Sequence, residues 1–313
     1  MAPGPTLTRT RVPVSVPTLP PLPPRSATEI VDGAVQLVRP EFAYFLRIAA
    51  IGAIPALIQA VVTLIVFPST TLDPQAMLRR ELTMLPLTML TYAFATMQSG
   101  AVIGGALAQL RGDILPTVWD AFLMAFRRIF SLLGANILLL LIVMAVLLPL
   151  VLAFAFLVGT SGAALTTLTG GRGGTVLAAV VGLLVLVLIL AGLLWIFARS
   201  AVMTALVIAE GLGPIQALKR AHFLSSGSQL RLVGTYGLVF IIILVVYLVL
   251  AGVALAFRNQ QALVQALLSV LLIPVVPILG AIMLLTYADL RVRREGADLD
   301  AALDALTGLP AHG

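Results

Sequence analysis

Charged side chains crowd together directly behind the last long apolar run of this 313-residue chain. Asp289 and Glu295 stand within a few positions of Arg291 and Arg293. Paired carboxylates can exchange protons in general acid–base catalysis, but such catalysis needs a cleft that holds a substrate, and the sequence indicates none. The alternative is the charged edge of a membrane-embedded protein, where arginines meet anionic headgroups.

A second stretch with polar chemistry is EGLGPIQALKRAHFLSSG, residues 210–227. Lys219 and Arg220 are placed to contact lipid phosphates or a partner. The competing interpretation is an interfacial helix whose basic side chains snorkel to water. His222 fits an amphipathic side chain at the interface better than a catalyst.

These two stretches supply all the site residues that we predict, as lipid or partner contacts. The carboxylates should form ion pairs with neighbouring arginines, and the pairs should link the last span to the 213–227 helix. We expect neither a catalytic nor a metal-binding residue. The predicted contacts are Glu210, Lys219, Arg220, Asp289, Arg291, Arg293 and Glu295.

The absence of certain residue types excludes several kinds of chemistry. The chain has no cysteine, which excludes disulfides and thiolate metal sites, and its two histidines are too few for a His-rich metal site or proton relay. No nucleophile, base and metal come together in the sequence. We therefore expect no cofactor and no enzyme activity.

The composition assigns the chain to the membrane. Hydrophobic residues make up 60% and charged residues 10%, with a mean hydropathy of +1.12. Soluble domains are about 45–50% apolar and about 25% charged. A water-soluble fold cannot bury so much apolar surface, because its loops and outer faces must be polar.

Six apolar stretches are long enough to be transmembrane helices, since about 20 residues cross a hydrocarbon core of about 30 Å. Their approximate spans are 46–67, 82–110, 129–158, 175–198, 232–257 and 263–287. The C-terminal end of the fourth span is the least defined boundary, because apolar residues continue past Arg199. Pro274 and Pro277 should kink the sixth span, which marks either a binding site or ordinary membrane-helix proline.

Three short amphipathic segments precede the first, third and fifth spans. Ser26-x-x-Glu29 is a capping box that begins a helix ending before Pro40. Pro214 suits the first position of the third helix and Gly227 its end. A faint repeat supports three units of surface helix plus hairpin: Asp32, Arg39 and Phe42 match the spacing of Asp120, Arg127 and Phe130.

The middle of each span lacks ionisable residues, so an ion-driven pump is not expected. Polar residues such as Gln59, Gln98 and Asn136 should join helices by hydrogen bonds. Gly100-x-x-x-Gly104 should allow close helix approach, with a substrate role as the alternative.

The basic residues predict the orientation. Fifteen of the 19 Lys and Arg residues fall on the side that holds both termini, so both ends should be cytoplasmic.

Two motifs resemble the glycerophosphoryl diester phosphodiesterase membrane-domain family, over about residues 27–300. Ala221 and His222 depart from the serine and the aromatic that the family usually has there. The resemblance implies a six-span module that some members fuse to a catalytic barrel, and we expect no barrel in this chain. The motif residues are Glu210-Gly211, Gly213-Pro214, Ala217-Leu218, Arg220, Leu224 and Gly227, then Tyr287, Asp289-Leu290-Arg291, Arg293, Glu295-Gly296 and Asp298-Leu299.

We therefore predict an all-α, polytopic helical bundle in the cytoplasmic (inner) membrane, with six transmembrane helices and three cytoplasmic amphipathic surface helices. Residues 1–25 should be a disordered Pro-rich tail, 26–300 the membrane domain and 301–313 a short cytoplasmic tail. The predicted function is a non-catalytic module that contacts membrane lipids or other membrane or cytoplasmic proteins, and no nucleic acid. The alternative is a transporter or channel-like protein for an uncharged or lipidic substrate.

Overall fold

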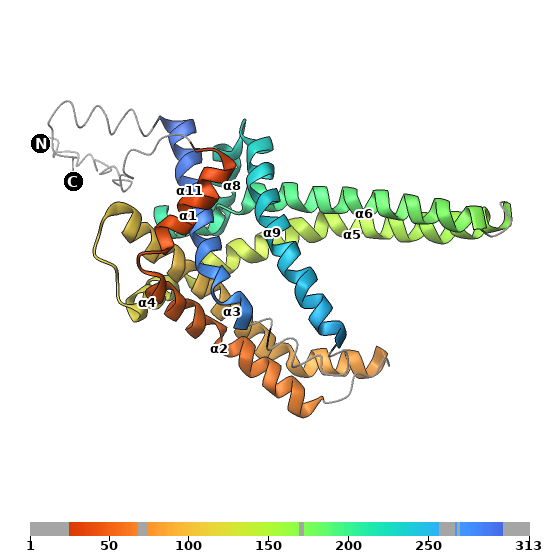
Figure 1. Ribbon diagram of the computed structural model, residues 1–313, viewed down its shortest axis with the longest axis horizontal. Helices are drawn as coiled ribbons and strands as arrows, with labels where there is room; N and C mark the ends of the chain where they lie inside the picture. Colours follow the sequence, from red (N-terminus) through yellow and green to blue (C-terminus); the bar gives the residue numbers. More distant parts are fainter. Residues whose placement is uncertain (1–24, 68–73, 169–171, 257–266, 268–269, 297–313) are drawn as a thin grey trace, which may run out of the picture.

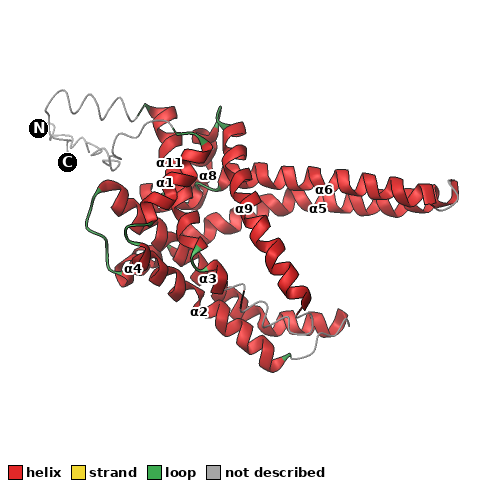
Figure 2. Ribbon diagram, in the orientation of Figure 1, coloured by secondary structure: helices red, strands yellow, loops and turns green. Residues whose placement is uncertain are grey.

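A computed structural model describes residues 25–67, 74–168, 172–256, 267 and 270–296. Within these ranges the regular structure is helical throughout, with no strand (Figure 2). The helices are α1 (Ala27–Val38), α2 (Phe42–Val66), α3 (Pro74–Arg111), α4 (Val118–Arg127), α5 (Ile129–Leu168), α6 (Arg172–Ser200), α7 (Met203–Glu210), α8 (Pro214–Ser225), α9 (Gln229–Ala256) and α11 (Val275–Glu295).

Helix α11 is the centre of the packing. It contacts α1, α2, α3, α7 and α8. In its most apolar stretch 67% of the residues are buried, against 6% in the corresponding stretches of α5 and of the segment Gly182–Glu210. The core therefore lies where α11 crosses its neighbours, and the described side chains of α5 and α6 are mostly apolar and exposed or half-buried, as expected of helices whose solvent is lipid.

Five helical segments are long and apolar enough to cross a membrane: Phe42–Val66, Ile129–Leu152, Gly182–Glu210, Gln229–Val249 and Val275–Glu295. The chain is thus a multi-pass membrane protein by the length and composition of its helices. The expected span 82–110 lies within α3, which forms a long helix but is not among the five. Polar residues and glycines such as Thr96, Gln98 and Gly100 lower its hydropathy, so crossing by α3 stays a prediction.

Helix α3 is joined to its neighbours by polar side chains, as the sequence predicts. Gln98 Nε2 donates to the backbone carbonyl of Ala49 on α2 at 2.7 Å. Asn136 Nδ2 on α5 donates to Thr96 Oγ1 at 3.2 Å. In an apolar surrounding these bonds satisfy groups that would otherwise have no partner, and so they fix how α2, α3 and α5 pack.

Glycines allow the closest helix contacts. A Cβ added at Gly280 of α11 would lie 2.5 Å from Val102 Cγ1 of α3, and one at Gly100 would lie 3.1 Å from Ala125 Cβ of α4. At Gly104 an added Cβ would meet Met124 Cε. The Gly100-x-x-x-Gly104 motif therefore brings α4 against α3, in agreement with its predicted packing role.

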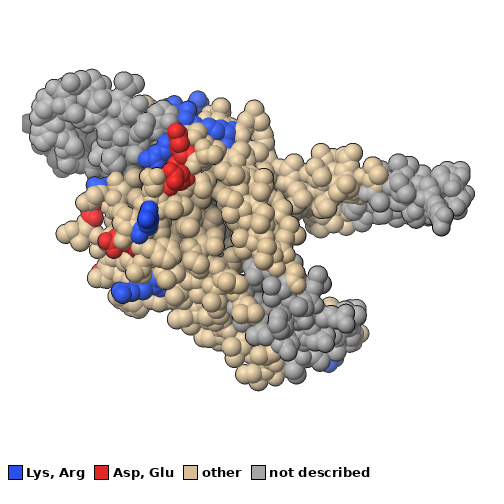
Figure 3. Space-filling view, viewed as in Figure 1, with Lys and Arg blue, Asp and Glu red and all other residues tan. Residues whose placement is uncertain are grey.

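The short helices gather at one end of the molecule. Figure 1 shows α5 and α6 extending side by side away from α1, α4 and α8, with α9, α2 and α3 diverging from the same end. We call this the polar end: α1, α4, α7, α8 and the last turns of α11. On the face drawn in Figure 3, most of the charged side chains collect over this end.

Local signals at the short helices are confirmed. Ser26 and Glu29 form the capping box of α1, with Ser26 N–H donating to Glu29 Oε2 at 2.6 Å. Pro214 opens α8, and Gly227 follows its end with φ +87°. The α1 face that carries Ile30, Ala34 and Val38 is buried.

The structure refines two predicted boundaries. Helix α6 ends at Ser200, and a turn separates it from α7, so the apolar continuation past Arg199 is a separate short helix. At the sixth span, Ile273 and Pro274 form a turn and α11 begins anew at Val275, which is a break and not only a kink. The predicted tails 1–25 and 301–313, apart from Arg25, and the acidic stretch from residue 297 lie outside the described residues.

Candidate functional site

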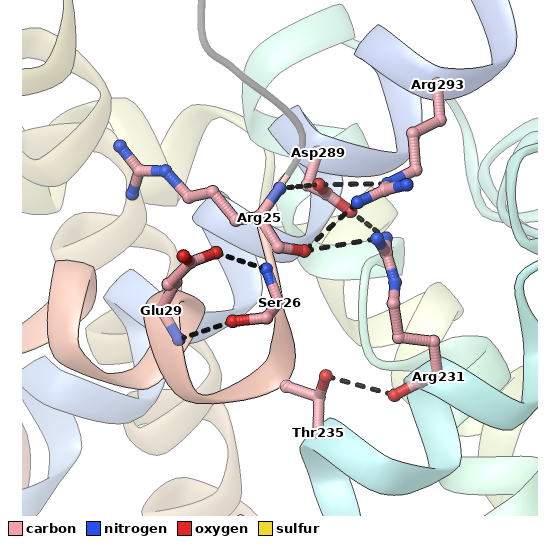
Figure 4. A network of polar contacts seen from close by, with 7 residues as sticks. All are labelled: Arg25, Ser26, Glu29, Arg231, Thr235, Asp289 and Arg293. Carbon is pink, nitrogen blue, oxygen red and sulfur yellow. Dashed lines mark hydrogen bonds and ion pairs between the residues drawn. The ribbon is translucent and has the colours of Figure 1, made fainter.

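Asp289 is the centre of a charged cluster at the polar end (Figure 4). Its side chain is 2% exposed, yet three groups donate to it. The Arg25 backbone N–H lies 2.8 Å from Oδ1, Arg293 Nε lies 3.1 Å from Oδ1, and Arg231 forms an ion pair with Oδ2. We call this the Asp289 cluster.

The Asp289 cluster ties three separate parts of the chain together. Asp289 and Arg293 stand one turn apart on α11, Arg231 lies in the first turn of α9, and Arg25 precedes α1. Both arginine side chains also donate to the Arg25 carbonyl, each at 3.1 Å. A buried carboxylate is stable only with such partners, because desolvation of an unpaired charge is costly.

Glu210 is the centre of a second cluster. It is the last residue of α7, and its side chain is 9% exposed. Arg220 Nε donates to Glu210 Oε2 at 3.2 Å and Tyr287 Oη donates to Glu210 Oε1 at 2.8 Å. Arg220 also pairs with Glu295, which accepts from Arg291 Nε at 3.0 Å. We call this the Glu210 cluster; it joins α7, α8 and α11.

The electrostatics of the Glu210 cluster favour a permanently charged Arg220. Burial alone would lower the pKa of this guanidinium, but the hydrogen bond and charge of Glu210, followed by those of Glu295, outweigh burial and raise the pKa above its ordinary value. Phe223 adds a cation–π contact, with Arg294 Cζ 5.1 Å from the ring centroid.

Six of the seven predicted contact residues thus engage one another, and the predicted ion pair from the last span to Arg220 is confirmed. Glu210 is the last residue of α7 and pairs with Arg220 of α8. Lys219 is the exception, since it lies exposed beside a cavity. Lipid or partner contact by the seven stays a prediction.

Sequence reasoning missed Arg128. Its guanidinium Nη1 donates to the carbonyls of Val207 and Ile208, the latter at 3.1 Å. These carbonyls belong to the last turn of α7, where backbone acceptors lack helical partners. The only sequence signal was the pair Arg127-Arg128 at the end of the predicted surface helix, which does not identify a partner 79 positions away.

Arg199 and His222 were also missed as a pair. Arg199 Nη2 lies 2.8 Å from His222 Nε2. Because a guanidinium only donates, the imidazole nitrogen accepts, and its proton stands on Nδ1. Arg199 Nε is buried and has no hydrogen-bond partner among the described residues.

A cavity of about 550 Å³ opens beside this pair, between α5, α6 and α8. Its apolar wall includes Ile142, Trp195 and Leu218, and its polar rim includes Arg199, Lys219 and His222. No carboxylate lines it among the residues that the structure describes. This volume falls within the range of about 300–1,000 Å³ for small-molecule sites.

The chemistry available at the polar end is therefore charge pairing and anion contact. Within the described ranges, no group of three or more His, Asp or Glu residues could hold a metal ion. Comparisons of the chain with protein-family models, curated proteins and solved structures find no match.

Proposed function

We propose that this chain is a non-catalytic membrane module in the cytoplasmic membrane, which contacts lipids or partner proteins through its polar end. The observation that carries the proposal is that the buried or half-buried carboxylates at this end form ion pairs with arginines. Glu210, Asp289 and Glu295 are all held by arginines of the same end. Their role is to hold α1, α7, α8, α9 and α11 together as a platform.

The polar end, to which α4 also belongs, combines exposed apolar and basic side chains, which suits an interface. Trp119 is 76% exposed and Phe130 is 87% exposed, on α4 and at the start of α5. Lys219 is exposed on α8. Aromatic and basic residues concentrate at membrane–water boundaries because one part of each side chain is apolar and the other polar.

The cytoplasmic orientation of this platform follows from the arginine bias, and labelling tests it. The chain has no cysteine, so a single Gln216→Cys on α8 or Gln75→Cys at the start of α3 is a unique target. A membrane-impermeant maleimide added from the cytoplasmic side should label Gln216→Cys and not Gln75→Cys. The reverse pattern would overturn the orientation, as would equal labelling.

The contact function is tested by extracting the protein from native membranes in polymer-bounded lipid discs. We expect the discs to be enriched in anionic phospholipid over the bulk membrane, or to hold a stoichiometric protein that crosslinks to the polar end. A disc whose lipids match the bulk membrane, and which holds no such protein, would refute the proposal.

The alternative, passage of an uncharged or lipidic substrate, is favoured by one observation. The chain breaks at Ile273-Pro274 where the sixth span was predicted, and broken helices build substrate sites in transporters. Entry of radiolabelled xylitol into protein-containing vesicles separates the two functions. If the protein is a non-catalytic module, xylitol should enter protein-containing vesicles at the same rate as protein-free vesicles. Faster entry into the protein-containing vesicles, at a rate that Pro274→Ala changes, would support transport.

A further inference from the structure

The cavity between α5, α6 and α8 has two chemically different parts. Arg199, Lys219 and His222 lie at its polar rim, where α6 ends and α8 passes. Ile142 and Trp195 belong to its apolar wall. A ligand that fits both parts carries an anionic group joined to a hydrocarbon chain.

Arg199 is poised to bind an anion. Among the described residues it contacts the neutral ring nitrogen of His222, and its buried Nε has no hydrogen-bond partner there. No carboxylate of the described chain lies within ion-pair distance of Arg199 or Lys219, in contrast to Arg220, one position further along α8. A phosphate accepts several hydrogen bonds from a guanidinium and would satisfy Nε.

The apolar wall is continuous with surface that faces hydrocarbon. Leu141 on α5 is 59% exposed and Leu188 on α6 is 56% exposed, both on helices that line the cavity. Trp195, one turn before Arg199 on α6, is 41% exposed, and tryptophan is a residue type that concentrates at membrane interfaces. The apolar wall of the cavity therefore lies on helices that carry exposed apolar side chains, which favours a lipid over a soluble phosphate.

We infer that this cavity binds one anionic phospholipid, with its phosphate on Arg199 and Lys219 and an acyl chain along Ile142 and Trp195. The inference rests on the proposed function, because it names the lipid that the module contacts and the place of contact. Anionic headgroups are preferred since the rim carries two permanent positive charges, and the positive group of a zwitterionic headgroup would be repelled by Lys219.

Native mass spectrometry tests the site, with full-length protein in mixed micelles of phosphatidylglycerol and phosphatidylcholine. The wild-type protein should retain one phosphatidylglycerol in preference to phosphatidylcholine. Arg199→Gln with Lys219→Gln should lower that retention about tenfold or more. The matched control, Arg39→Gln with Arg127→Gln, removes the same charge from exposed positions at the same end and should leave retention unchanged.

A second variant blocks the apolar part without a change of charge. Ile142→Trp should fill the wall and lower retention, while thermal unfolding in detergent shows that the fold is kept. Adding glycerophosphoglycerol, the headgroup without acyl chains, should not displace the lipid; displacement at equal concentration would show a soluble-anion site and overturn the inference.

The remaining outcomes separate the site from the function. If both double variants lose phosphatidylglycerol equally, the attraction is diffuse and the site is wrong. If the wild-type protein prefers phosphatidylglycerol and neither Arg199→Gln with Lys219→Gln nor Ile142→Trp alters it, the site is wrong but lipid contact stands. A wild-type protein with no preference refutes the site, while the native-disc experiment decides the function independently.

Discussion

The backbone N–H of Arg25 donates a hydrogen bond of 2.8 Å to the carboxylate of Asp289, across 264 positions of sequence. This contact connects the start of the described chain to the last turns of α11. Arg231 completes the link by binding both the Asp289 carboxylate and the Arg25 carbonyl. Removal of the charge at residue 289 therefore affects three segments at once.

Asp289→Asn should be destabilising. The amide leaves Arg231 and Arg293 without the buried carboxylate that pairs with them. Because these two side chains are 24% and 36% exposed, water screens the loss, and we expect a cost of about 1–3 kcal/mol, below that of a fully buried pair. Thermal unfolding in detergent should show a lower midpoint, and trypsin should cut after Arg25 faster. Asp32→Asn is the control, since Asp32 is exposed and, within the described part of the chain, accepts a hydrogen bond from Gln36 alone, one turn along α1. Equal midpoints for the two variants would contradict the role of Asp289.

Gly280→Ala should disturb the crossing of α11 and α3. The added methyl would lie 2.5 Å from Cγ1 of Val102, whose branched side chain is fully buried and has little freedom to move. Such overpacking costs about 1–3 kcal/mol. At Gly192 an added Cβ meets nothing within 4 Å, so Gly192→Ala should be neutral or slightly stabilising. Thermal unfolding in detergent should show a lower midpoint for Gly280→Ala than for Gly192→Ala, and equal midpoints would contradict the close contact of α11 with α3.

Arg128→Ala should weaken the attachment of α7. The variant removes a charged donor from the carbonyls of Val207 and Ile208, and hydrogen bonds to charged groups contribute about 1.5–3 kcal/mol. Hydrogen exchange should become faster in α7 and α8 before the rest of the chain. Arg127→Ala, at an exposed neighbouring position, should stay within about 0.5 kcal/mol of the wild type. Faster exchange in both variants would indicate a general effect of charge.

Acid should loosen the first turn of α1. Hydrogen bonds from the Ser26 backbone N–H and hydroxyl lower the pKa of Glu29 below its ordinary value of 4.5. Because the folded pKa is the lower one, the capping box stabilises α1 above pH 4.5, and this contribution is lost as the pH falls through the folded value. Protection of the first-turn amides, corrected for intrinsic exchange, should fall over this range. Glu29→Gln should remove the pH dependence.

Local features were predictable because their determinants are close in sequence. The capping box of Ser26 and Glu29 and the opening of α8 at Pro214 depend on neighbours within one helical turn. The charge–charge contacts of Arg291 with Glu295 and Arg293 with Asp289 are i,i+4 pairs on one helix. Periodicity and spacing suffice for such contacts.

Contacts between distant segments were not predictable from the sequence. Arg231 stood at the start of an apolar run, and no pattern pairs it with Asp289, 58 positions away. The cavity at Arg199 depends on how α8 crosses the ends of α5 and α6, which hydropathy does not encode. The break at Pro274 was expected only as a kink, because Pro274 and Pro277 in the sequence do not reveal whether the helix continues through them or ends and begins again.

The 40-residue helix α5 is about 60 Å long, at about 1.5 Å per residue. Even tilted by about 40°, a helix uses only about 26 residues to pass through a hydrocarbon layer of about 30 Å. Helix α5 begins at the polar end, where it contacts α7 and α8, so the turns that a layer of this thickness does not need can pack against the short helices of that end.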